Sequence, residues 1–173
     1  MEDFQIIKDI EGHSIVVINN IVFKGRRGIN WDEVQEYVKK YIAKSYNILE
    51  YADVIYIGAD FPEEIKGSFD TIRTKGGNAK AKANATTVMP YLIKYATNKR
   101  WQENYKYKHS KDVKLGRYRF TTRFAMPSYD GKNELISYNI YRIELLIKHA
   151  EDNKMYLYDL VNTRKEASNP LEQ

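Results

Sequence analysis

The fold prediction starts from the stretch YKYKHSKDVKLGRYRFTTRF, residues 105–124. In its second half, RYRFTTRF, arginine or threonine alternates with an aromatic residue or threonine. Alternation with a period of two is typical of a β-strand with one buried and one solvated face. The solvated face would carry Arg117, Arg119, Thr121 and Arg123. Guanidinium groups in such a row repel one another unless an anion lies over them, and phosphate suits this planar donor. The alternative is a solvated edge strand whose charges discourage aggregation.

Charge is distributed unevenly along the chain. Residues 1–72 contain 8 lysine and arginine residues against 13 aspartate and glutamate residues, whereas residues 73–173 contain 20 against 10. The basic part includes Lys108, Lys111 and Lys114, within the stretch quoted above. A block this basic is typical of a polyanion-binding surface, so we expect RNA or another nucleic acid as a partner. In the alternative interpretation, the acidic part of the chain docks on the basic part.

Apolar periodicity and turn signals predict the elements of the first hundred residues. These are a β-hairpin (14–18 and 21–24), a helix (30–42), a short buried strand (54–58), a long loop (60–77), an alanine-rich helix (78–89) and a second helix (91–98). The first helix is predicted from apolar residues that recur every three and four positions, with Asn30 as its N-cap. The loop is predicted from its content of glycine, proline and charge.

The last third of the chain predicts a three-stranded antiparallel meander. The strand that carries the arginines is followed by turns at 127–133 and 151–154 and by strands at 135–148 and 155–161. Helices followed by strands indicate an α+β fold with a small antiparallel sheet. We expect an acidic hairpin–helix extension at residues 1–45 and a basic α+β domain at residues 46–173.

The sequence contains no cysteine, which excludes disulfides, thiolate catalysis and cysteine-ligated zinc. Its histidine, aspartate and glutamate residues show no metal-ligand spacing, so we expect no metal and no cofactor. No apolar run approaches the roughly 18 residues of a membrane span, and the first residues do not resemble a signal segment. We therefore expect a cytoplasmic protein with no membrane partner.

Glu144 and Arg142 are charges within a strand that is predicted to be central and buried. A buried charge is strongly unfavourable unless it is paired, so these side chains should face a polar cleft or each other. A carboxylate that faces arginines of the neighbouring strand suits metal-independent RNA cleavage. The carboxylate takes the 2′-hydroxyl proton, an arginine holds the phosphate, and an imidazole protonates the leaving 5′-oxygen. The alternative is a structural ion pair of Glu144 with Arg142 or Arg119.

Three histidines are candidates for the acid: His13, His109 and His149. His109 lies among lysines, a setting that would place it against phosphate. His149 ends the predicted central strand beside Lys148. His13 precedes the predicted hairpin in the acidic part, and we expect it to be a bystander.

Two segments, GRYRFTTRFAMP (116–127) and YNIYRIELLIKHAEDNKMYLYDLVNTRKEASNPLE (138–172), resemble a domain family of bacterial mobile elements. These are the phage-associated members of the barnase–EndoU–colicin–RelE nuclease superfamily (PBECR), and the resemblance covers roughly residues 46–172. It implies helices followed by a small antiparallel sheet with an RNA-cleaving site on its concave face. It also implies metal-independent cleavage through a cyclic phosphate. By role, Arg119 and Arg123 would hold the phosphate, Glu144 would be the base, and His109 or His149 the acid.

The other polar residues of the basic stretch and of the two long strands are predicted to bind substrate. They are Lys108, Lys111, Lys114, Arg117, Thr121, Arg142, Lys148 and His149. Two functions follow from these predictions. One is a ribonuclease-like toxin or counter-defence effector of a mobile element. The other is a non-catalytic, anti-CRISPR-like inhibitor that grips nucleic acid or a protein of a host defence complex, with a host or phage protein as its partner. A third, structural interpretation has the basic half meet only the acidic half.

Overall fold

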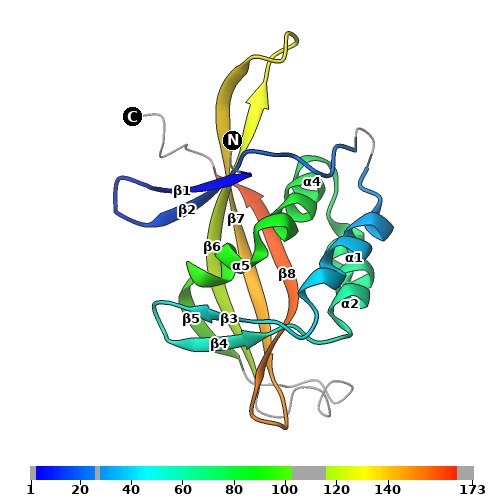
Figure 1. The fold of residues 1–173 in the computed structure, drawn as a ribbon, viewed down its shortest axis with the longest axis vertical. Helices are drawn as coiled ribbons and strands as arrows, with labels where there is room; N and C mark the ends of the chain where they lie inside the picture. Colours follow the sequence, from blue (N-terminus) through cyan, green and yellow to red (C-terminus); the bar gives the residue numbers. More distant parts are fainter. Residues whose placement is uncertain (1–2, 26–27, 103–115, 167–173) are drawn as a thin grey trace.

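The computed structural model describes residues 3–25, 28–102 and 116–166, where helices pack on one face of a curled sheet (Figure 1). The strands are β1 (Phe4–Lys8), β2 (Ser14–Ile18), β3 (Ser45–Ile48), β4 (Asp53–Tyr56), β5 (Thr97–Gln102), β6 (Arg117–Tyr129), β7 (Leu135–His149) and β8 (Met155–Lys165). The helices are α1 (Trp31–Val38), α2 (Phe61–Gly67), α3 (Phe69–Arg73), α4 (Gly76–Ala85) and α5 (Met89–Lys94), with 3-10 turns at Lys39–Tyr41 and Thr86–Val88. The predicted α+β class is confirmed.

The sheet is larger than predicted and is mixed rather than antiparallel. Its strand order within the described residues is β1-β2-β6-β7-β8-β4-β3, and β5 pairs with β6 beside β2. The predicted meander β6-β7-β8 forms the antiparallel centre. However, β2 pairs with β6 in parallel, and so does β4 with β8. Strands from the first 60 residues therefore extend the sheet on both sides, a long-range pairing that local patterns do not encode.

The predicted hairpin of residues 14–18 and 21–24 is wrong. β2 pairs instead with β1, through a turn in which Asp9 Oδ1 accepts the backbone N–H groups of Glu11 and His13. Residues 22 and 23, after β2, form no sheet ladder. Their backbone groups form hydrogen bonds with the buried side chain of Asn84 instead. Asn84 Oδ1 accepts from the amides of Val22 and Phe23 at 3.0 Å each, and its Nδ2 donates to Phe23 O.

The predicted loop at 60–77 is also wrong, because most of it is helical. α2 carries Pro62 in its first turn and buries Phe61 and Ile65, and α3 is capped by Ser68, whose Oγ accepts the Thr71 amide. The predicted helix at 91–98 ends early at Lys94, and the chain continues as β5. By contrast, α1 has its predicted cap, since Asn30 accepts the Asp32 amide. Short helices with few apolar positions lack the long periodicity that sequence patterns detect.

The alternation in β6 is confirmed. Phe120, Thr122 and Phe124 are buried on the helix-covered face, where the two phenylalanines join apolar residues of β7, β8 and the helices. The opposite face continues into an apolar cluster around Ala125 and Ile140, and the section of it before that cluster, which we call the polar face, carries four register pairs of the two long strands. These pairs are Arg117 with Lys148, Arg119 with Leu146, Thr121 with Glu144, and Arg123 with Arg142.

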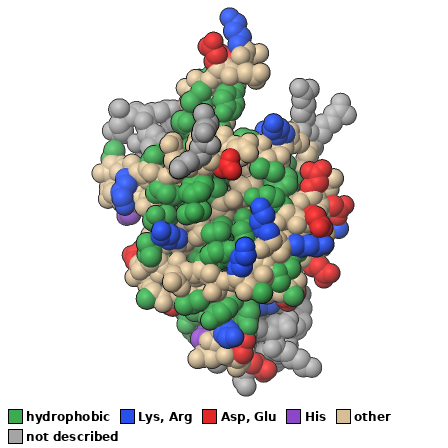
Figure 2. All heavy atoms as spheres, in the orientation of Figure 1, with side chains coloured by type: hydrophobic (Ala, Val, Ile, Leu, Met, Phe, Trp, Pro, Cys, Tyr) green, Lys and Arg blue, Asp and Glu red, His purple; other side chains and the backbone are tan. Residues whose placement is uncertain are grey.

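Ion pairs connect the acidic part of the chain to the basic part. Ion pairs join Asp9 to Arg123, Asp53 to Lys99, Asp60 and Glu64 to Lys148, and Asp70 to Lys82. At these positions the acidic part of the chain therefore docks on the basic part, as the alternative interpretation of the charge distribution expected. Other acidic side chains remain exposed over α1 and α2, where Figure 2 shows them gathered at one side of the helical layer. In the parts of the chain that the structure describes, no helix is long and apolar enough to cross a membrane.

Candidate functional site

Glu144 lies at the centre of a polar cluster on the polar face. Its Oε1 accepts hydrogen bonds from Arg119 Nη1 and Asn162 Nδ2, both at 2.9 Å, and its Oε2 lies 3.2 Å from Arg100 Nη2. The Glu144 side chain is 22% exposed, so the cluster is partly open to solvent. Two guanidinium groups around one carboxylate leave a net positive charge. This Glu144 cluster can therefore bind an anion beside a group that accepts protons.

Arg100 joins the cluster through a β-bulge in β5. Arg100 pairs with Arg119 across the ladder, and the register shifts between Thr97 and Arg100. Within the bulge, Asn98 has a φ of 55°, a left-handed conformation that asparagine tolerates better than most residues. Arg100 Nη1 donates to Asn98 O at 2.9 Å and to Thr121 Oγ1 at 3.1 Å, which holds the guanidinium in place. The sequence analysis missed Arg100 because it extended a helix to residue 98.

Asn162 is held by a second bulge, in β8. It has a φ of 56°, and its backbone N–H donates to Asp70 Oδ1 at 3.1 Å. Asp70 in turn accepts a hydrogen bond at 2.8 Å from Lys82, whose side chain is fully buried. A continuous chain of contacts therefore runs from Lys82 through Asp70 and Asn162 to Glu144. No pattern in the sequence indicated this support.

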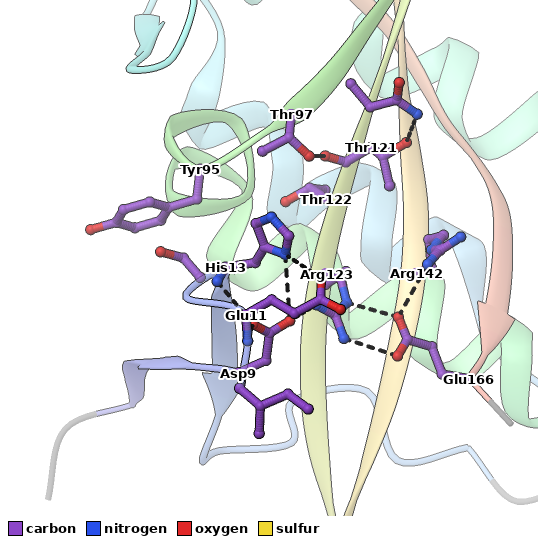
Figure 3. Close-up of a pocket in the computed structure, with 13 residues that line it drawn as sticks. Asp9, Glu11, His13, Tyr95, Thr97, Thr121, Thr122, Arg123, Arg142 and Glu166 are labelled. Atoms are coloured by element: carbon purple, nitrogen blue, oxygen red, sulfur yellow. Dashed lines mark hydrogen bonds and ion pairs between the residues drawn. The ribbon is translucent and has the colours of Figure 1, made fainter. Parts of the chain in front are cut away.

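Beside the Glu144 cluster, a hollow of about 490 Å³ opens along β6 (Figure 3). Thr121 belongs to both, because it lines the hollow and accepts the hydrogen bond from Arg100. The lining residues come from the β1–β2 turn and the start of β2, from β5 and the residues before it, from β6 and β7, and from the residue that follows β8. They are Asp9, Ile10, Glu11, His13, Ser14, Tyr95, Thr97, Asn98, Thr121, Thr122, Arg123, Arg142 and Glu166. Most of this lining is polar or charged, which suits a polar ligand.

Arg123 is held on both sides by carboxylates. Glu166 receives two hydrogen bonds from it, Nε to Oε1 at 2.7 Å and Nη2 to Oε2 at 3.0 Å, and Asp9 Oδ2 receives a third from Nη1. Burial raises the pKa of Asp9, but hydrogen bonds from Arg123 and from the amides of His13 and Glu11 lower it to about 2. Asp9 therefore stays ionised. Arg123 binds the β1–β2 turn to the end of β8, and phosphate would have to share or displace these contacts.

The hollow contains a histidine that the sequence analysis set aside. His13 is 57% exposed, and its Nδ1 lies 3.7 Å from Asp9 Oδ2 and 3.6 Å from Glu11 Oε2. These distances suit ion pairs when the imidazole is protonated. His13 reaches the hollow because β2 pairs with β6, an arrangement that only the tertiary structure shows.

The remaining predicted residues lie in several places. Arg142 is 60% exposed at the rim of the hollow, opposite Arg123 on one side and Arg164 on the other. Arg117 and Lys148 lie together at the far end of the polar face. His149 Nε2 lies 2.8 Å from Asn153 Oδ1 in the β7–β8 turn, away from Glu144. His109, Lys108, Lys111 and Lys114 lie outside the described residues.

Comparisons of the chain with family models, with curated proteins and with solved structures found no match. Function must therefore be inferred from the site itself.

Proposed function

We propose that the Glu144 cluster binds the sugar–phosphate chain of RNA and that the protein is a metal-independent endoribonuclease. The observation that carries the proposal is one partly exposed carboxylate held between two guanidinium groups on the polar face. The proposal places the chain in the barnase–EndoU–colicin–RelE superfamily, as a toxin or counter-defence effector of a bacterial mobile element. The large mixed sheet would then be an extended form of that fold.

In this mechanism Glu144 is the general base. Its carboxylate takes the proton of a ribose 2′-hydroxyl, and the 2′-oxygen attacks the adjacent phosphorus. Arg100 and Arg119 stabilise the negative charge that develops on the phosphoryl oxygens. The bond to the 5′-oxygen then breaks, and that oxygen takes a proton from an acid. The products are a 2′,3′-cyclic phosphate and a free 5′-hydroxyl, and the reaction written in this way requires no metal or cofactor.

The acid has two candidates. The sequence predicts His109 or His149; His149 lies at the β7–β8 turn, away from Glu144, which leaves His109, and that residue lies outside the described residues. His13 is the candidate from the structure, because its exposed imidazole lines the hollow that adjoins the cluster at Thr121. General acid catalysis typically contributes about 10²- to 10⁴-fold to a rate. Substitution of the correct histidine by alanine should therefore lower cleavage by that factor, whereas substitution of the other should not.

The test is cleavage of end-labelled RNA in the presence of EDTA. Glu144→Gln keeps the shape of the side chain and an oxygen for Arg119, but it removes the base. We expect about a 10²- to 10⁴-fold slower rate, with 2′,3′-cyclic phosphate ends in the wild-type products. Glu134→Gln, on the exposed β6–β7 turn, is the matched control and should cleave as the wild type does. Equal rates for Glu144→Gln and the wild type would rule out this mechanism.

One observation favours a second candidate function, a non-catalytic inhibitor. Arg123, Arg142 and Arg164 are direct neighbours across β6, β7 and β8. Like charges in such positions are destabilising unless an anion lies among them. In the described part of the chain, Glu166 forms ion pairs with Arg123 and Arg142 but not with Arg164. A binder that grips nucleic acid or an acidic host protein would use this arginine row without any base or acid. RNA binding with a steep salt dependence and no cleavage would support this function.

A further inference from the structure

A second cluster of charged side chains occupies the far end of the polar face. Arg117 and Lys148 are direct neighbours across β6 and β7. The guanidinium carbon of Arg117 lies 5.8 Å from the centre of the Tyr158 ring, and Lys148 Nζ lies 5.5 Å from the same centre. Two cations therefore share one aromatic ring. Like charges in this position repel each other, so the pair is stabilised by nearby anions.

The described residues satisfy this cluster only in part. Lys148 Nζ lies 3.6 Å from Asp60 Oδ2 and 3.6 Å from Glu64 Oε1, which are ion-pair distances longer than a good hydrogen bond. Among the described residues, no hydrogen-bond acceptor is found for the buried Nε of Arg117. Most buried N–H groups in proteins are paired, so an unpaired one needs an explanation. A bound anion that accepts from Arg117 supplies it.

We propose that Arg117 and Lys148 form a second phosphate subsite for RNA on the polar face, and that Glu64 of α2 tunes its affinity with pH. This subsite rests on the proposed function of the Glu144 cluster. Lys148 lies four residues along β7 from Glu144, which corresponds to about 13 Å. A phosphate at this subsite therefore belongs to a different nucleotide from the phosphate at Glu144. The subsite would make affinity depend on the length of the RNA.

Glu64 supplies the pH dependence. Burial raises its pKa to about 7, Lys148 lowers it and Asp60 raises it. Among the described residues, Asp159 and Tyr158 also interact electrostatically with Glu64, and Arg117 lies beside the Tyr158 ring. At pH 6 Glu64 is mostly neutral, and Asp60 is then the one charged carboxylate that pairs with Lys148 among the described ion pairs. Above pH 7 Glu64 ionises and competes with phosphate for Lys148. The subsite should thus bind more tightly at pH 6 than at pH 8.

The experiment measures fluorescence anisotropy of labelled RNA with 2′-O-methyl riboses, which cannot be cleaved through the 2′-oxygen. An octanucleotide and a dinucleotide are compared at pH 6 and pH 8 over a series of salt concentrations. For the wild type we expect tighter binding of the octanucleotide, by more at pH 6. Arg117→Gln and Lys148→Met should each weaken octanucleotide binding and reduce its salt slope by about 1. Dinucleotide binding should not change, nor should octanucleotide binding by the control Lys132→Met at the other end of the sheet.

Arg117→Gln and Lys148→Met are both tested so that a folding defect in one of them does not decide the result. Lys148→Met leaves two carboxylates without their lysine, whereas Arg117→Gln leaves the lysine and both carboxylates in place. In a third variant, Glu64→Gln, octanucleotide affinity at pH 8 should rise to the pH 6 value of the wild type. If the wild type binds both oligonucleotides but Arg117→Gln leaves the octanucleotide affinity unchanged, the subsite is refuted and the proposed function stands. If the wild type binds neither oligonucleotide, the proposed function fails first. A pH dependence retained in Glu64→Gln would refute the role of Glu64.

Discussion

Lys82→Met should strongly destabilise the protein, because Lys82 neutralises two buried carboxylates. The ammonium group is fully buried, 2.8 Å from Asp70 Oδ2 and 3.1 Å from Asp159 Oδ1. Burial raises the pKa of Asp159 to about 6 even though Lys82 lowers it. Methionine is close to lysine in volume, so the substitution removes the charge with little change in packing. It leaves two carboxylates that are almost completely buried.

The expected loss follows from the charge that remains. Removal of one partner from a buried ion pair costs about 3–5 kcal/mol, so we expect about 4 kcal/mol at pH 8, where both carboxylates must ionise. At pH 5 Asp159 is already largely protonated in the folded state. A pKa difference of one unit corresponds to about 1.4 kcal/mol, so the loss at pH 5 should be smaller by about 1–2 kcal/mol. Since domains have a total stability of about 5–15 kcal/mol, the effect is large.

Urea denaturation followed by circular dichroism at pH 5 and pH 8 measures both values. Lys80→Met, on the same helix and with no described ion pair, is the matched control and should cost less than about 0.5 kcal/mol. If Lys82→Met does not fold at pH 8, the double variant with Asp159→Asn should regain at least about 1 kcal/mol, because it removes one of the two charges. A loss below about 1 kcal/mol at pH 8, or an equal loss at both pH values, would refute the reasoning.

Two further predictions concern stability. Asn84→Ala removes the side chain that forms hydrogen bonds with the backbone of residues 22 and 23. Two unpaired amides should lower the free energy of unfolding, measured by urea titration, by about 2–4 kcal/mol. A loss of less than about 1 kcal/mol would contradict this role. The free energy of unfolding of the wild type should fall as the pH rises from about 4.5 to 7.5. The reason is that the folded-state pKa values of Asp159 (about 6) and Glu64 (about 7) lie above those of the unfolded chain. Unfolding free energies across that range test this, and Asp159→Asn should make the profile flatter.

Local patterns predicted those elements that have a clear period. Alternation in residues 117–124 indicated both the strand β6 and the face on which its arginines lie, and the Asn30 cap located α1. The ion pair of Arg119 with Glu144 was one of the predicted alternatives, since adjacent strands bring residues of the same face together. Patterns failed where elements are short, as in α2 and α3, or where a strand begins with a bulge, as in β5.

By itself, the sequence determined the α+β class, the central meander and the charged face of its long strands, because these depend on periodicities of two and of three to four residues. The tertiary structure alone decided which residues complete the site. Arg100 reaches Glu144 through a bulge in β5, Asn162 through a bulge in β8, and His13 approaches because β2 lies parallel to β6. Each of these placements depends on pairing between segments distant in sequence. Such pairing is set by the packing of the whole core rather than by neighbouring residues.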